Sequence, residues 1–419
     1  MNEEDDRLIW RSSVVPKRSC LAVNVKMIEP LSKIPTGMKY YFGAQARLRR
    51  WVEDTAMEVF RGWSYEEITT PSVDYYALFE RGMGTTEAER AFRFTDADGR
   101  LLALRPDVTS GVARAAATLF AERTRPLRFC YAAAVFHQRS RSHAEWRRET
   151  TQIGCELIGT GGIVADMEIL LIAAEVLRRL GLDGQYRITL NNAEIFNGVA
   201  EKLNLDVSAR EQFRQLIDAR NASELESFLA SYASAKESAA FAQLTRLAGK
   251  SEMFERARAV ISNQRSRRAL AQLEELWRTV EALGMAEHFE IDLGDVSELD
   301  YYTGLIFRIY LRGAGARVGS GGRYDGLTAN FGRDEPAIGF VFDLDALTEV
   351  IWRKGNGANA EGQATPVFDQ DPTALFRKAL RARESGAQIV VEEMMTSSGH
   401  MACEAELKRL NFGEESNEG

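Results

Sequence analysis

The stretch LRFCYAAAVFHQRSRSHAEWRRETTQIGCELI, residues 127–158, decides how this sequence folds. Apolar runs at its two ends, 127–135 and 152–158, predict strands, and a basic polar loop separates them. On both sides further strands and helices follow without regular alternation. This favours an α+β fold with an antiparallel sheet flanked by helices over a doubly wound sheet. The other expected elements are helices at Arg47–Arg61, Val112–Leu119, Met167–Leu180 and from Leu344, a hairpin at Ala91–Leu104, strands at Tyr186–Leu190, Phe289–Ile291 and Tyr301–Leu311, and a glycine-rich turn at 319–326.

One face of the second strand is unusually polar. Gln152, Gly154 and Glu156 lie on the same face because side chains alternate along a strand. A buried carboxylate is costly without a partner, so such a face is either exposed to solvent or set against a ligand. The strand alone leaves both interpretations open.

Periodicity and composition divide the chain into parts. Helical spacing runs through 193–285 and indicates a helical insertion in the core. The segment GNGANAEG, residues 355–362, has the composition of a linker. The expected parts are an N-terminal extension at 1–38, a core at 39–350, a linker at 351–366 and a small C-terminal α/β module at 367–419. In this module we expect a helix at Thr373–Arg383, a strand at Gln388–Glu392 and a second short helix.

Composition limits the class of protein. The 419 residues are 45 % hydrophobic and 27 % charged, as in soluble globular proteins, and no apolar run is long enough for a membrane helix. A net charge of −8 argues against a dominant nucleic-acid-binding surface. Four well-separated cysteines and four histidines predict neither a disulfide framework nor a metal site. A start of MNEEDD, with no apolar segment behind it, fits the cytoplasm.

Three more segments carry candidate binding groups, each with a structural alternative. In LRPDVT, residues 104–109, a carboxylate two residues before a hydroxyl could hold an ammonium group or simply cap a helix. In LDYYTG, 299–304, paired tyrosines could line a small pocket or pack in the core. In GSGGRYDG, 319–326, four glycines could let the backbone approach a ligand or form a tight hairpin turn.

In this order, the segments resemble the core of the histidyl-tRNA synthetases from about Gly37 to Val350. GWSYEEITTPSVDYYALF, starting at Gly62, is similar to motif 1 of class II aminoacyl-tRNA synthetases, and Phe129 to Glu156 would be motif 2. GRYDG with PAIGFVFDLDAL, at 336–347, is similar to motif 3. LRPDVT, PLRFCYA and ETTQIGCELIG look closest to a paralogous family, the regulatory subunits of short-form ATP phosphoribosyltransferase.

The resemblance implies a histidine pocket. In such a pocket, residues with oxygen acceptors would bind the α-ammonium group of histidine. A carboxylate and a phenol would bind its imidazole ring, and further tyrosines would line the cavity. Asp107 is one methylene shorter than the glutamate usual in the synthetases and matches the regulatory family better. The implied assignments are Asp107, Thr109 and Gln152 for the ammonium, Glu156 and Tyr302 for the imidazole, and Tyr301 and Tyr324 for the lining.

Departures from the synthetase pattern argue against catalysis. Synthetases of this type use three arginines to neutralise ATP and the forming adenylate, whereas His137, Ser297 and Ala346 stand at those positions here. Removing one such transition-state donor typically costs about 2.7–4 kcal/mol, so three losses predict negligible adenylation. Only 72 residues (419 minus 347) follow Leu347, too few elements for an anticodon-binding domain.

These features predict a non-catalytic regulatory subunit that needs no cofactor. It would form a homodimer, assemble with a short-form catalytic ATP phosphoribosyltransferase, and bind histidine for feedback control of the first step of histidine biosynthesis. Two alternatives stay open, a divergent histidyl-tRNA synthetase and a synthetase-like binding protein with another ligand.

Overall fold

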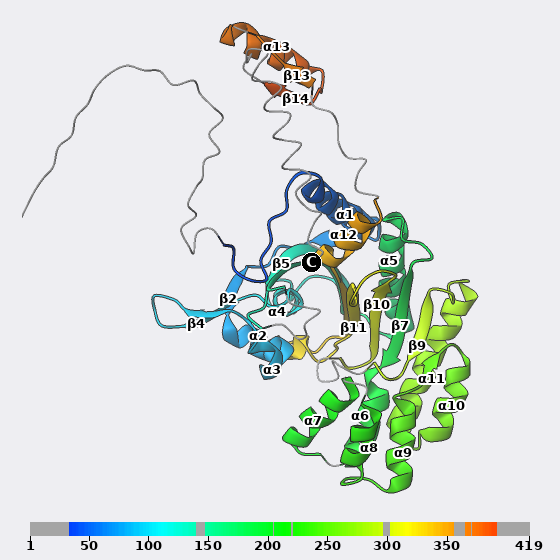
Figure 1. The fold of residues 1–419 in the computed structure, drawn as a ribbon. Coiled ribbons are helices and arrows are strands. Elements are labelled where there is room, and N and C mark those ends of the chain that lie inside the picture. Colours follow the sequence, from blue (N-terminus) through cyan, green and yellow to red (C-terminus); the bar gives the residue numbers. More distant parts are fainter. Residues whose placement is uncertain are drawn as a thin grey trace, which may run out of the picture.

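A nine-stranded sheet forms the centre of the protein (Figure 1). The computed structural model describes residues 33–139, 147–203, 205–218, 221–295, 302–355, 365–369 and 371–391. All neighbouring strands in the sheet are antiparallel except the pairs β1·β5 and β7·β9. The predicted α+β fold with a mainly antiparallel sheet is thus confirmed. In spatial order the strands are β1 (Glu66–Glu67), β5 (Leu127–Phe136), β6 (Glu149–Ile158), β12 (Ala337–Asp343), β11 (Gly319–Arg323), β10 (Leu305–Leu311), β7 (Tyr186–Asn192), β9 (Phe289–Asp292) and β8 (Ala248–Gly249).

Three helices pack on one face of this sheet. They are α1 (Gly43–Gly62), α5 (Gly162–Arg179) and α12 (Leu344–Arg353), and they contact one another and strands β5, β6 and β12. Each turns a stripe of buried apolar side chains inward, with the i, i+3, i+4 spacing of an amphipathic helix. These helices and the inward residues of β6, such as Ile153 and Leu157, form the main core. Because side chains alternate along β6, Gln152 and Glu156 lie on the opposite face.

Helix α4 (Thr109–Ala117) contacts β6 on that opposite face, and the chain also forms a smaller, separate sheet. The small sheet has the order β2-β4-β3, with β2 at Val73–Tyr75, β3 at Arg93–Thr95 and β4 at Leu101–Leu104. β3 and β4 confirm the predicted hairpin, and Gly99 takes the positive φ of 78° that its turn requires. Helices α2 (Tyr76–Met83) and α3 (Thr85–Ala88) follow β2.

The segment predicted as a helical insertion is almost entirely helical. Its helices enclose an aromatic cluster of Phe196, Phe213 and Phe241, and α11 packs along α6. The two-residue strand β8 is the exception to the predicted helical pattern. The helices are α6 (Ala193–Leu203), α7 (Val207–Asp218), α8 (Ala222–Leu229), α9 (Ala235–Leu244), α10 (Glu252–Val260) and α11 (Gln264–Ala282).

The glycine-rich segment 319–326 was predicted to be a turn, and this prediction is wrong for residues 319–323. Residues 319–323 form strand β11 in the middle of the sheet, between β12 and β10. Glycine is disfavoured in strands, but here the missing side chains make room for neighbours. A Cβ on Gly321 would lie 2.4 Å from Phe340 Cβ and 2.5 Å from Phe307 Cζ. Close packing across β10, β11 and β12 therefore outweighs the low strand propensity.

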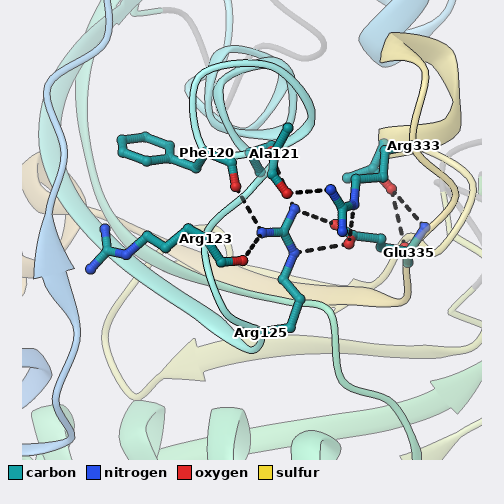
Figure 2. A network of polar contacts seen from close by, with 8 residues as sticks. Phe120, Ala121, Arg123, Arg125, Arg333 and Glu335 are labelled. Atoms are coloured by element: carbon teal, nitrogen blue, oxygen red, sulfur yellow. Dashed lines mark hydrogen bonds and ion pairs between the residues drawn. The ribbon is translucent and has the colours of Figure 1, made fainter.

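A polar network ties together two loops beside α4 (Figure 2). Arg125 donates to both carboxylate oxygens of Glu335, at 2.8 and 3.0 Å, and to the Phe120 carbonyl at 2.8 Å. Arg333 donates to the same carboxylate at 2.6 Å and to the Ala121 carbonyl. Because these groups are largely buried, the shared carboxylate fixes the loop after α4 to the loop before β12.

The C-terminal region contains a small β-α-β unit. Strands β13 (Thr365–Val367) and β14 (Ile389–Val391) pair in parallel, and helix α13 (Pro372–Glu384) connects them. The helix was predicted at Thr373–Arg383 and the second strand at Gln388–Glu392, and both are confirmed, whereas β13 was not predicted. Residues 351–353 of the predicted linker belong to α12. A further short helix was expected after 392, which lies outside the described residues.

Candidate functional site

Glu156 on β6 is the centre of a buried hydrogen-bond cluster. Its side chain is 1 % exposed, and three hydroxyl groups donate to it. Thr109 Oγ1 and the Tyr131 hydroxyl donate to Oε1 at 2.7 and 2.8 Å, and the Tyr324 hydroxyl donates to Oε2. Donors from three separate parts of the chain thus converge on one carboxylate, as a costly buried acid requires.

The sheet register explains why a glutamate fits there. Glu156 lies opposite Gly339 of β12, and a Cβ on Gly339 would be 1.7 Å from Glu156 Oε2. The carboxylate therefore occupies space that only glycine leaves open. This agrees with the expectation that β6 presents a carboxylate beside glycines, but the face is buried and not exposed to solvent.

Asp107 lies just before α4 and uses only one of its oxygens. Oδ2 accepts from Ser110 Oγ at 3.0 Å, so the carboxylate does take part in the local start of α4. Oδ1 is buried and has no hydrogen-bond partner among the described residues. A buried acceptor without a donor usually marks a missing partner, such as a ligand or a water molecule.

Gln152 shows the same feature on the neighbouring strand. It lies on the Glu156 face of β6, opposite Asp343 of β12, and its Oε1 is buried without a partner among the described residues. Asp107, whose charge acts on Glu156, and Gln152, four residues away on the same face of β6, therefore each supply one unused acceptor. Such a set favours a ligand with several N–H donors.

Two of the three predicted tyrosines lie in the same place. Tyr302 and Tyr324 are both buried in the apolar cluster beside Glu156, and Gly322 leaves room for the Tyr302 ring, whose Cδ1 would lie 2.8 Å from an added Cβ. Tyr301 lies outside the described residues. The structure thus brings Thr109, Glu156 and Tyr324 into direct contact and places Tyr302 in the cluster beside them.

Tyr131 was not predicted as a site residue. It is 1 % exposed, and on sequence it is one aromatic residue in an apolar strand, which normally indicates core packing. Cross-strand pairing could have indicated its role. Tyr131 lies directly opposite Gly154, which has no side chain and separates Gln152 from Glu156 on the polar face of β6. A large ring facing a glycine beside a carboxylate is the pattern that could have identified it.

Burial sets the electrostatics of the two carboxylates. Burial raises the pKa of Glu156 to about 7, although hydrogen bonds from Tyr324, Thr109 and Tyr131 oppose the shift and the nearby charge of Asp107 adds to it. Burial also raises the pKa of Asp107 to about 6, against its bonds from Ser110. The cluster therefore favours a positively charged partner that would keep both groups ionised.

The positions where synthetases carry arginines supply no phosphate-binding cation. His137 follows β5, and its backbone donates to the Arg148 carbonyl at 2.8 Å. Ala346 is in the first turn of α12, where its backbone donates to Asp343 at 2.9 Å. Ser297 and Glu298 lie outside the described residues. Arg147, from the basic segment, is paired with Glu349 at 2.5 Å.

Other kinds of site were also considered. Within the described residues, no group of three or more His, Cys, Asp and Glu side chains is placed to hold a metal ion. No helix in the same residues is long and apolar enough to cross a membrane.

Comparison with known proteins places the chain in a family. The histidyl-tRNA synthetase family model matches residues 37–347. A Clostridium kluyveri protein named ATP phosphoribosyltransferase regulatory subunit is 32 % identical over 358 residues, covering 84 % of this chain and 91 % of that protein. A protein of the same name from Syntrophotalea carbinolica is 36 % identical over 383 residues, covering 90 % of this chain and 89 % of that protein.

Solved structures agree with this relationship. The crystal structure of an ATP phosphoribosyltransferase regulatory subunit/histidyl-tRNA synthetase from Bacillus halodurans has a TM-score of 0.76 at 26 % identity, covering 89 % of this chain and 96 % of that one. Histidyl-tRNA synthetase from Nostoc has a TM-score of 0.71 at 19 % identity, covering 90 % and 89 %, and shows the shared fold. The chain belongs to the family of ATP phosphoribosyltransferase regulatory subunits, whose core is that of the histidyl-tRNA synthetases.

Proposed function

We propose that this protein is a non-catalytic subunit that binds histidine and transmits feedback control to a catalytic ATP phosphoribosyltransferase. The observation that carries the proposal is a pair of unused buried acceptors, Asp107 Oδ1 and Gln152 Oε1, of which Asp107 acts on the charge of Glu156 and Gln152 lies on the Glu156 face of β6. Histidine offers an ammonium group with three N–H donors and an imidazole N–H, which match this set. In this assignment Asp107, Thr109 and Gln152 receive the ammonium, while Glu156 and Tyr302 receive the imidazole.

The residues at three motif positions support a regulatory role over an enzymatic one. His137 and Ala346 replace two synthetase arginines, Ser297 replaces the third, and Arg147 is bound to Glu349. Adenylate formation needs preorganised cations at the developing phosphate charge, and a retained amino-acid pocket without them favours sensing. Control by histidine then requires different histidine affinities in two states of the assembly, because equal affinity shifts no equilibrium.

We further propose that the protein acts as a homodimer in the cytoplasm. An apolar face of the small sheet supports the dimer: Val73, Tyr75 and Phe94 lie on one face and are 40 %, 47 % and 42 % exposed. Val73 and Tyr75 fall within the segment similar to motif 1, which the resemblance assigns to dimerisation. A second copy would cover side chains that are otherwise costly to expose.

Titration calorimetry with L-histidine tests the pocket. We expect binding by the unaltered protein and at least about tenfold weaker binding by Asp107→Asn, which removes the charge opposite the ammonium. The matched control is Asp98→Asn, in the exposed turn of the β3–β4 hairpin, which should bind as the unaltered protein does. No binding at millimolar histidine would contradict the sensor proposal.

Two assays separate the alternatives. Histidine-dependent exchange of pyrophosphate into ATP would identify a divergent histidyl-tRNA synthetase, and we expect none. Failure to co-purify with a short-form catalytic subunit, or to change its activity, would favour a synthetase-like protein with another ligand or partner.

A further inference from the structure

We propose that Tyr131 is a positioning residue for the ligand pocket, which acts by fixing the carboxylate of Glu156 in its ionised form. This rests on the proposed histidine binding and adds a residue to that site. Tyr131 is not among the residues assigned above to contact the ligand. Its effect would pass through Oε1 of Glu156, to which its hydroxyl donates at 2.8 Å.

The pairing of β5 with β6 brings Tyr131 within reach of Glu156. The residue directly across from Glu156 is Phe129, so Tyr131 reaches Glu156 diagonally, past its own cross-strand partner Gly154. Diagonal neighbours in a sheet are within reach of an aromatic side chain. A Cβ on Gly154 would lie 3.0 Å from the Tyr131 hydroxyl oxygen and 2.4 Å from the Phe340 carbonyl oxygen. The glycine therefore keeps open the path that the phenol takes.

The Tyr131 hydroxyl is a buried donor to Glu156. Tyr131 is buried in the apolar cluster with Tyr302 and Tyr324, and burial keeps its pKa well above the ordinary value, so the hydroxyl remains a donor. Thr109 Oγ1 also donates a hydrogen bond to Oε1 of Glu156. Two donors on Oε1 hold the carboxylate in one orientation, because a hydrogen bond to a charged acceptor is strong and directional.

The surroundings of Glu156 make this donor important. The titratable groups facing it are Asp107 ahead of α4, Tyr131 on β5 and Tyr324 after β11, with Tyr302 in the same cluster. No described arginine or lysine pairs with Glu156, so hydroxyl donors supply the stabilisation of its negative charge. Removing one donor should favour the protonated carboxyl, which cannot accept an imidazole N–H in the same way.

The test is the pH dependence of histidine affinity in Tyr131→Phe. Loss of the hydroxyl should raise the pKa of Glu156, so histidine binding by the variant should be weaker at pH 6 than at pH 8.5, relative to the unaltered protein. We divide the dissociation constant of the variant by that of the unaltered protein at each pH. We expect this ratio to be at least about threefold larger at pH 6 than at pH 8.5, since each unit of pKa shift changes the ionised fraction up to tenfold. Titration of histidine itself affects both proteins equally and cancels in the ratio.

The matched control is Tyr65→Phe. Tyr65 is also buried, and its hydroxyl donates to a carboxylate, Glu168, at 2.8 Å, but on the helix-covered face of the sheet. This control should bind histidine with an unchanged pH profile. The positioning role is overturned if the ratio of dissociation constants, Tyr131→Phe over unaltered protein, is the same at both pH values or equal to one. Histidine sensing would still stand in that case. No binding by the unaltered protein overturns the proposed function itself, and the positioning role with it.

Discussion

At the scale of residues, the pocket is governed by the cost of burying acids. Glu156 and Asp107 are carboxyl groups with raised pKa values, and their neighbours are hydroxyls and not cations. Three donors on Glu156 satisfy its oxygens but do not restore the stabilisation that water gives to a charge. Protonation of these two carboxyls and binding of a cationic ligand beside them would therefore compete.

This competition predicts how stability depends on pH. The carboxyl of Glu156 has a pKa of 4.5 when unfolded and about 7 when folded. Between these values the folded state holds a proton that the unfolded state has lost, so the free energy of unfolding falls as the pH rises. We expect the unaltered protein to lose about 2–3 kcal/mol more than Glu156→Gln between pH 5 and pH 8 in urea unfolding. Equal losses in the two proteins would contradict the burial argument.

Residue chemistry was partly predictable from sequence. The alternation of Gln152, Gly154 and Glu156 correctly indicated one polar face, and the structure places Thr109 and Tyr324 on Glu156. The role of Tyr131 was not predictable from its own neighbours in the chain, because its partner is 25 residues away. A contact of that kind depends on strand register, which a single strand pattern does not specify.

At the scale of elements, β11 shows packing prevailing over propensity. Four of the residues at 319–323 are Gly319, Ser320, Gly321 and Gly322, a composition that favours a turn. The strand forms because large rings on β10 and β12 fill the space above these glycines. Sequence periodicity predicted the amphipathic helices well, because the apolar face of a helix is visible within one continuous segment. Whether a glycine-rich segment forms a strand depends instead on the strands that pair with it.

Substitution within β11 tests this explanation. Gly321→Ala would place a Cβ 2.4 Å from Phe340 Cβ and 2.5 Å from the Gly339 carbonyl oxygen, so the strands must separate. We expect a loss of about 1–3 kcal/mol in the free energy of unfolding, measured in urea. Ser320→Ala, on the same strand, should change it by less than about 0.5 kcal/mol. If the two variants were equally stable, close packing would not be the reason for the glycines.

At the scale of the whole molecule, the proposed function joins a histidine-binding site to motif positions that lack the synthetase arginines. The resemblance predicted the fold, and the comparisons confirm the family. The pattern of missing arginines could be read from sequence because each position lies in a motif. The assembly could not, because subunit contacts depend on a partner surface, although the exposed apolar side chains Val73, Tyr75 and Phe94 suggest where one would lie.

The proposed feedback control would be a property of the complex and not of this chain alone. A ligand in the Glu156 pocket can change catalysis in another subunit only if the two states of the assembly bind it with different affinities. A coupling of 1–3 kcal/mol would correspond to about a 5- to 150-fold difference between those affinities. Asp107 and Gln152 are the groups whose unused oxygens could supply that difference.

The most direct measurement is the activity of a short-form catalytic ATP phosphoribosyltransferase reconstituted with this protein, with and without histidine. We predict that the complex is active and that millimolar histidine inhibits it, whereas the complex containing Asp107→Asn is active but resists inhibition. An unaltered complex that is equally active at all histidine concentrations would contradict the central claim that this subunit senses histidine.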